Sequence, residues 1–438
     1  MILTVVIDSY GNKQLTQKLD NPKSHPFEDD FFIFLQWFKR PKICFYIYKI
    51  KGCLLRGGRL IKLKSYFLHL FDSPEFESVL PIEEYEELKQ ELVYEYEQPS
   101  MESIALLPNE TKIIKEIRAE TTKYNRNNLT RTKAYLTFYK KHPEIHWALL
   151  AHMVSRNGGY HMTDLKGDLM NHLFKEGDRK KFFCFLEDAN AAIFADAYPQ
   201  LLLYSYAINQ SFDLRKFLTI FHVSRFMRPI WDQFSHKKNS TLLTIALIIN
   251  EQQMLEERLL TRSPYSQLLK RLDFQLQENL GFTMVLFPYQ QKKDTLTRMT
   301  GLVVRRFADL KSRILIGKKL YFLLFQDLQV LKGVLEFCRD VPHSGSRADY
   351  WSGVFSTKKR NRVYSPVLGD AWSDTALSYV PKNDWFVNVQ FIKDVQTYPK
   401  VKRNDLTKQA FEQITMLQMI NKTSQLITTE NRETARSE

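Results

Sequence analysis

The alternation of apolar and polar positions predicts a mainly helical protein from about Leu80 onward. In the run LPIEEYEELKQEL, a proline and several acidic residues come early, as is typical of the start of a helix. After Val341 the helical period breaks in a segment rich in aromatic and turn residues, which predicts an irregular lobe laid over the helices. Further helices are expected at about 131–141, 143–156, 163–176, 179–198, 201–209, 212–227, 241–260, 264–279, 302–316 and 318–339.

The same pattern suggests how the chain is divided. Residues 1–75 contain strand-compatible runs, ILTVVI and ICFYIYKI, and differ from the rest of the sequence. We therefore expect a mostly α protein: a multi-helix globular core with an irregular C-terminal lobe and a small N-terminal extension that can contain β-structure. The expected segments are a basic and aromatic extension at 1–75, a helical core at 76–340, a lobe packed on the core at 341–420 and a flexible tail at 421–438.

One predicted helix carries two histidines in an apolar setting. Of the ten residues from Ile145 to Val154, eight are apolar and the other two are His146 and His152. A helix that is apolar nearly all round is a buried helix, so both imidazoles are expected to be buried and hydrogen-bonded. The two lie six positions apart, about 120° around a helix, so we do not expect one metal ion to be held by both.

Two interpretations remain open for the residues after this helix. Asn157–Gly159 predicts the end of the helix, and Thr163 is a plausible N-cap for the next one. Backbone amides at that new N-terminus, with Arg156 and His161 nearby, would form an anion cradle. Asn-Gly-Gly is also ordinary turn chemistry, which needs no ligand.

A second polar cluster follows at Pro342–Trp351, and it could share a pocket with the first. Each cluster interrupts apolar helical sequence with charged and imidazole side chains, so we expect the two to meet across the core. No phosphate-loop, dinucleotide or serine-elbow motif is present, and neither catalytic residues nor a cofactor can be named. The candidate ligand-binding residues are His146, His152, Arg156, His161, Asp164, His343, Arg347, Asp349 and Asp370.

The positive charge is unevenly distributed along the chain. The net charge is +14, and residues 281–408 contain 22 basic and 11 acidic side chains. Residues 31–71 have nine basic and no acidic side chains, whereas residues 72–97 have ten acidic ones, so these two blocks nearly cancel. A basic surface attracts nucleic acid, anionic lipid or acidic protein, although dispersed basic residues also form ordinary solvated surface. The candidate polyanion-binding residues are Arg305, Arg306, Lys358, Lys359, Arg360 and Arg362.

Cysteine usage and apolar runs bear on the compartment. The four cysteines form no C-x-x-C pair, and no apolar run approaches the roughly 18 residues of a membrane span. The start of the sequence lacks the basic region and cleavage pattern of a signal peptide. These features favour a cytoplasmic protein without a transmembrane segment.

Three strings resemble a known family. HPEIHWALLAHMVSRNGGYHMTDLKG, HSGSRADYW and YSPVLGDAW are similar to the YppC-like proteins of Bacillus-type bacteria, a domain of unknown function, over roughly Leu80–Asp384. The resemblance implies a bacterial, soluble protein and brings no activity, cofactor or site residue. Charge and pattern favour a non-enzymatic binding protein that engages an acidic partner through its basic C-terminal third. The alternative is an enzyme or small-ligand binder for an anionic, for example phosphorylated, compound held by the His/Arg/Asp cluster.

Overall fold

The chain divides into two compact units, Met1–Ser73 and Pro74–Glu438, and the described residues belong to the second. The predictions for the N-terminal extension and the C-terminal tail, and those for Arg305 and Arg360, fall outside the described residues. The division into four segments therefore remains a prediction. The computed structural model describes residues 75–98, 106–171, 173–209, 213–270, 284–292, 295–304, 306–359, 362–375 and 383–419.

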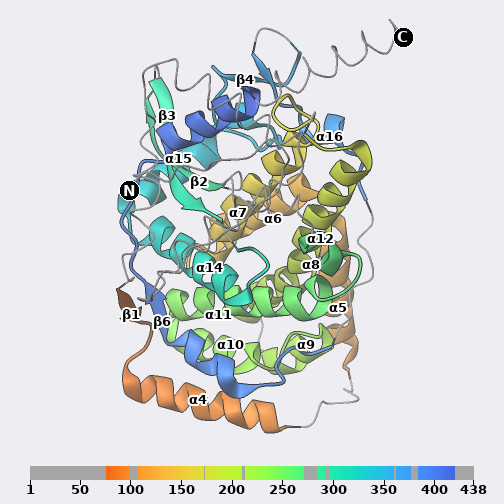
Figure 1. Ribbon diagram of the computed structural model, residues 1–438. Coiled ribbons are helices and arrows are strands. Elements are labelled where there is room, and N and C mark those ends of the chain that lie inside the picture. The colour runs from red at the N-terminus through yellow and green to blue at the C-terminus, as the bar shows by residue number, and fades with distance from the viewer. Residues whose placement is uncertain are drawn as a thin grey trace, which may run out of the picture. The chain divides into compact units, whose positions relative to one another are not determined.

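The described residues are mostly helical, which confirms the predicted fold class (Figure 1). Residues 407–419 form a last helix. No helix among the residues described is long and apolar enough to cross a membrane. The helices are α4 (Ile82–Glu97), α5 (Pro108–Tyr124), α6 (Asn128–Lys141), α7 (His146–Asp164), α8 (Glu176–Asn209), α9 (Leu214–Ile220), α10 (Met227–Lys237), α11 (Ser240–Leu255), the π-helix η1 (Glu256–Leu260), α12 (Tyr265–Leu269), α14 (Leu310–Phe325), α15 (Leu328–Asp340), α16 (Leu368–Ala371) and the 3-10 helices η2 (Arg347–Asp349) and η3 (Val389–Val395).

The described strands form short two-stranded pairs, one of which joins distant parts of the chain. The strands β2 and β3 form an antiparallel hairpin, β1 pairs antiparallel with β6, and β4 pairs in parallel with β5. The β1–β6 pair ties the start of the described chain to its C-terminal part, with Phe76 opposite Pro399. The strands are β1 (Phe76–Ser78), β2 (Met284–Lys292), β3 (Thr295–Val303), β4 (Phe355–Ser356), β5 (Val363–Tyr364) and β6 (Thr397–Pro399).

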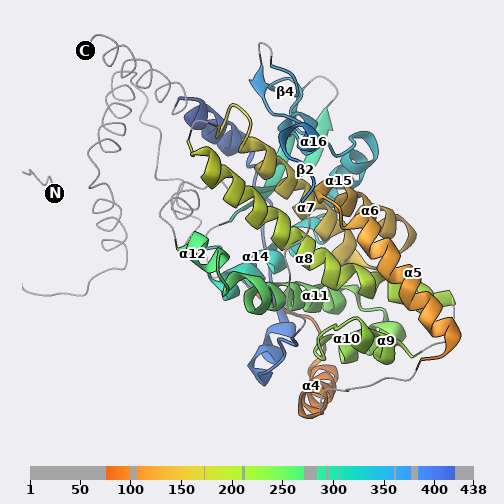
Figure 2. The same ribbon diagram turned by 90° about the vertical axis from the view of Figure 1, so that its right-hand side faces the viewer.

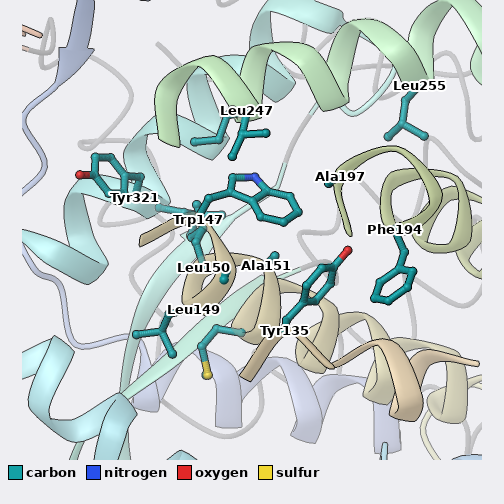
Figure 3. Close-up of a cluster of buried hydrophobic side chains, with 14 of the residues drawn as sticks. Tyr135, Trp147, Leu149, Leu150, Ala151, Phe194, Ala197, Leu247, Leu255 and Tyr321 are labelled. Carbon is teal, nitrogen blue, oxygen red and sulfur yellow. The ribbon is translucent and has the colours of Figure 1, made fainter. Parts of the chain in front are cut away.

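The centre of the core lies where α6, α7, α8 and α11 meet. Trp147 of α7 faces Tyr135 of α6 with ring centroids 5.4 Å apart, and Phe194 of α8 lies 5.2 Å from the same tyrosine ring (Figure 3). Leu247 of α11 covers the other side of Trp147. Away from this centre, α4 lies at one end beside α10, while the β2–β3 hairpin and α15 lie towards the opposite end (Figures 1 and 2).

The prediction that a helix ends at Asn157–Gly159 is wrong, because α7 continues to Asp164. The glycine serves close packing rather than chain reversal: a Cβ on Gly159 would lie 2.7 Å from Asn128 Oδ1 and 2.8 Å from the His343 ring. The amide of Asn157 hydrogen-bonds both the N–H and the C=O of Leu286 in β2, at 2.8 and 3.0 Å. Asn157 and Gly159 therefore make tertiary contacts, and they do not end the helix as the local sequence pattern predicted.

Other element predictions also need correction. The helix expected at 163–176 is a series of turns, since the Asp168 N–H and its carboxylate bond to Tyr364 in β5. The helices expected at 179–198 and 201–209 are one helix, α8, in which Pro199 is buried. The first residues of the helix expected at 302–316 belong to strand β3. Periodicity alone cannot assign a short apolar run to a helix or to a strand. The helix expected at 143–156 begins three residues later, at His146.

Candidate functional site

The two polar clusters meet, as the sequence predicted. The guanidinium of Arg347 in η2 binds the carboxylate of Asp164 at the end of α7, with Nη2 2.7 Å from Oδ2 and Nε 2.9 Å from Oδ1. The Arg347 guanidinium also lies 4.3 Å from the centre of the Tyr160 ring. Both partners are buried, at 8% and 2% exposure, so this ion pair is shielded from solvent. It joins the last turn of α7 to the segment that follows α15.

Arg156 makes a second connection, about two turns earlier on α7 than Asp164. Its Nη2 donates to the Pro342 carbonyl at 3.2 Å and lies 3.6 Å from Asp349 Oδ2. Its guanidinium lies 4.3 Å from the Phe337 ring centre, and Arg156 is only 1% exposed. The Asp349 carboxylate also accepts hydrogen bonds from the backbone and hydroxyl of Ser344. The carboxylates of Asp164 and Asp349 therefore both have partners within the protein.

His343 completes the assembly on the side of α6. Its Nε2 donates to Asn128 Oδ1 at 2.8 Å, and Asn128 Nδ2 donates to the Ser155 carbonyl at 2.9 Å. Burial lowers the pKa of His343, so the ring is neutral near pH 7. We call the six residues Asn128, Arg156, Asp164, His343, Arg347 and Asp349 the α7 network.

The remaining predicted site residues lie outside this network. His152 is buried and its Nδ1 donates to the Thr132 carbonyl at 2.8 Å, as predicted from its apolar helix. His146 is hydrogen-bonded as predicted, to the Tyr321 hydroxyl at 3.2 Å, but the prediction that it is buried is only partly right: it is half-buried and stacks on Phe325 at 4.0 Å. It therefore belongs to the contact between α7 and α14.

His161 and Asp370 are also separate from the charged pairs. The Nε2 of His161 donates to the Met284 carbonyl of β2 at 3.0 Å. Asp370 is exposed on the short helix α16. Among the described residues, no group of three or more His, Cys, Asp or Glu side chains is placed to hold a metal ion.

The geometry of the α7 network favours an internal scaffold. An anion site presents donors to solvent, whereas here the guanidinium groups face carboxylates, a carbonyl and aromatic rings inside the protein. The predicted cradle at a helix N-terminus is wrong, because Thr163 and Asp164 lie at the C-terminal end of α7. A ligand-binding role for the nine candidates remains a prediction, and it would require these ion pairs to open.

A second buried network was missed by the sequence reasoning. The carboxylate of Asp196 accepts hydrogen bonds from Gln200 at 3.0 Å, Asn250 at 2.7 Å and Arg258 at 3.3 Å. The two amide oxygens accept in turn from the indoles of Trp231 and Trp385. Asp196 and Gln200 stand four positions apart in an otherwise apolar stretch, a signal that could have identified them. The network joins α8, α10, α11 and η1 to the C-terminal segment.

Comparison with known proteins places the chain in a family. Residues 123–417 match the model described as "Protein of unknown function (DUF2515)". The chain is 38% identical over 277 residues to "Uncharacterized protein YppC" of Bacillus subtilis (strain 168), an alignment that covers 63% of this chain and 83% of that protein. No solved structure matches. The family match begins at the end of α5 and includes both clusters of the α7 network, and the chain belongs to the DUF2515 family of proteins of unknown function.

Proposed function

We propose that this protein is a non-enzymatic binding protein of the cytoplasm that engages an acidic partner through exposed basic side chains in its C-terminal third. The observation that carries the proposal is the segment between β4 and β5. Lys358, Lys359 and Arg362 are exposed there, and none of the three forms an ion pair within the described part of the chain. We call these three residues the basic loop.

Some other basic side chains in the same third are paired, whereas Lys311, Lys332, Lys393 and Lys402 are exposed and form no ion pair within the described residues. Arg298 lies 2.5 Å from Asp405, and Arg403 lies 3.0 Å from Asp327. Unpaired cations keep their full charge for a partner, whereas paired ones contribute little to the field outside the protein. The basic loop gathers three exposed, unpaired cations within five positions, and this clustering supports it as the contact surface. Arg306 is exposed as well, with a left-handed backbone at φ 54°.

The contacts within the basic loop suggest different roles for its members. Arg362 Nη1 donates to the Ser352 carbonyl at 2.5 Å, which anchors the end of the loop. Lys359 Nζ lies 5.5 Å from the Tyr364 ring centre. The Lys358 backbone N–H donates to the Ser356 hydroxyl at 3.1 Å, but the ammonium groups of both lysines form no hydrogen bond within the described part of the chain, so they can reach phosphate or carboxylate groups.

The test uses charge reversal on the full chain. Binding to a fluorescent DNA duplex and to vesicles containing phosphatidylserine would be measured between 50 and 200 mM NaCl for the wild type, Lys358→Glu/Lys359→Glu and the control Lys112→Glu. Lys112 is 78% exposed on α5, far along the chain from the basic loop. We expect the double variant to bind at least tenfold more weakly and to lose about two units of salt slope. Equal binding by wild type and double variant would contradict the proposal.

A further inference from the structure

The helix α4 has an acidic side that no other described element neutralises. Glu83, Glu87 and Glu91 are exposed, and none of the three forms an ion pair within the described residues. At a spacing of four residues they lie along one side of the helix, about 12 Å from the first to the last. Tyr94, 59% exposed, lies on the same side one turn further along. We call these four residues the acidic face.

An open hollow adjoins the end of the acidic face that contains Tyr94. Its volume is about 400 Å³, and its lining residues are Gln90, Glu91, Tyr94 and Arg215. The Arg215 guanidinium is held by the carboxylates of Glu95, at 2.8 Å, and of Asp232. Glu95 pairs in addition with Arg228 at 3.1 Å. Three carboxylates thus stand against two guanidinium groups, and Glu91 is the one that has no ion pair.

The pKa of Glu91 agrees with an excess of negative charge at this place. Partial burial raises the pKa, Arg215 opposes the rise, and the carboxylates of Asp232, Glu87 and Glu95 add to it. A cation that approaches the acidic face is therefore attracted, and an anion is repelled.

The basic loop matches the acidic face in charge and in length. Its three exposed cations, Lys358, Lys359 and Arg362, form no ion pair within the described part of the chain. Four peptide units separate Lys358 from Arg362, so their Cα atoms lie at most about 14 Å apart, close to the length of the row of carboxylates. Three cations can thus reach three carboxylates, and one of them can also lie over the Tyr94 ring.

The two surfaces lie at opposite ends of the described part of the chain. In both views α4 is at the lower end, whereas β4, which precedes the basic loop, is at the upper end (Figures 1 and 2). The basic loop of one copy therefore cannot reach the acidic face of the same copy. Contact between two different surfaces of identical chains is heterologous, and it can repeat from copy to copy.

We propose that the acidic face of α4 binds the basic loop of a second copy of this chain, so that the copies associate head to tail. The inference rests on the proposed function, since it identifies the acidic partner of the basic loop as another copy of the protein. Exposed ion pairs are individually weak and are screened by salt. We therefore expect a micromolar association that is lost at high ionic strength.

The first test measures the mass of the full chain in solution. Sedimentation velocity would be recorded at protein concentrations up to about 200 μM, in about 50 mM and in about 500 mM NaCl. We expect the mass to rise with protein concentration in low salt and to remain that of one chain in high salt. A wild-type chain that is monomeric in low salt, or that associates equally at both salt concentrations, overturns the proposal.

Charge reversal identifies the two surfaces. Lys358→Glu/Lys359→Glu and Glu87→Lys/Glu91→Lys should each associate roughly tenfold more weakly than the wild type, or weaker still, because like charges then face each other. An equimolar mixture of the two variants should associate again. In the mixture the unchanged acidic face of one variant meets the unchanged basic loop of the other, and the two reversed surfaces are also of opposite sign. Undiminished association of either variant, or a mixture that stays monomeric, contradicts the head-to-tail contact.

Controls separate these effects from a general change of charge or fold. Lys112→Glu on α5 and Glu176→Lys on α8 alter side chains that are 78% and 81% exposed, and both should associate as the wild type does. Circular dichroism would establish that each variant retains the helical fold. If Glu87→Lys/Glu91→Lys does not fold, Glu87→Gln/Glu91→Gln takes its place and should also weaken association.

The results distinguish this inference from the proposed function. Binding to DNA and to vesicles depends on the basic loop and not on the acidic face. If Lys358→Glu/Lys359→Glu loses that binding while the wild type is monomeric, the proposed function stands and the head-to-tail contact is overturned. If the wild type associates and both reversals act as expected, the contact is supported whether or not DNA and vesicles bind.

Discussion

Arg347 and Asp164, 183 positions apart in sequence, form a buried ion pair that joins the end of α7 to the segment after α15. Breaking such a pair from one side leaves the other charge buried without a partner, at a cost of about 3–5 kcal/mol. We therefore expect Asp164→Asn to lower the free energy of unfolding by about 3 kcal/mol, measured by urea denaturation. The double variant Asp164→Leu/Arg347→Met should recover part of this loss. A loss below about 1 kcal/mol in Asp164→Asn would contradict the buried pair.

Gly159 provides a test of close packing in the α7 network. An added Cβ would lie under 3 Å from both Asn128 and His343, whose positions are fixed by hydrogen bonds. We expect Gly159→Ala to destabilise the protein by about 1–3 kcal/mol. The control is Gly177→Ala in α8, where a Cβ meets nothing within 4 Å and helix propensity should add about 0.5–1 kcal/mol. In thermal denaturation we expect Gly159→Ala to lower the melting temperature and Gly177→Ala to raise it.

The histidines of α7 predict an acid-sensitive fold. Burial lowers the pKa of His152 and His161 to about 3 and that of His146 to about 4. An unfolded histidine has a pKa of about 6.5, so below that pH the unfolded chain binds more protons than the folded one. Stability should be full above pH 6.5 and fall as the pH decreases towards 4, by up to about 4 kcal/mol per unit for three groups. His152→Gln should reduce this slope by about a third, as denaturation at pH 7, 6 and 5 would show.

Glu251 should produce the opposite dependence. Burial raises its pKa to about 7, although hydrogen bonds from Gln252 and Trp147 oppose the rise. The unfolded group ionises near 4.5, so its contribution is present below that pH and is lost as the pH rises from 4.5 to 7. We expect Glu251→Gln to be more stable than the wild type by roughly 1–3 kcal/mol at pH 8 and equal to it at pH 4.5. A difference that does not change with pH would exclude this titration.

The division of the chain near residue 75 can be tested by truncation. The described residues have their own core, and β1 begins at Phe76, where it pairs with β6. A chain that starts at Glu75 should unfold cooperatively, with a midpoint within a few degrees of the full chain. A chain that starts at Leu80 lacks β1 and should unfold at a lower temperature. Loss of cooperative unfolding in the Glu75 chain would show that the first 74 residues belong to the core.

Sequence patterns predicted what depends on local periodicity. The apolar surroundings of His152 correctly indicated its burial, and the polar interruptions around Asp164 and Arg347 correctly indicated a contact across the core. The end of α7 could not be predicted, because the glycine at position 159 is required by close contact with residues of α6 and of the segment after α15. The small cleft lined by Asn127, Glu187 and Trp372 could not be predicted either, since its lining comes from three segments up to 247 positions apart.

The bonds from α7 to β2 have a consequence for self-association. A two-stranded hairpin leaves free N–H and C=O groups along its edges, and a free edge can pair with a strand of another chain. Here Asn157 binds the Leu286 N–H and C=O, while Tyr160 and His161 both donate to the Met284 carbonyl. Side chains of a helix thus take the place of a third strand on β2. The polar residues of α7 protect this edge from the aggregation that an uncovered hairpin invites.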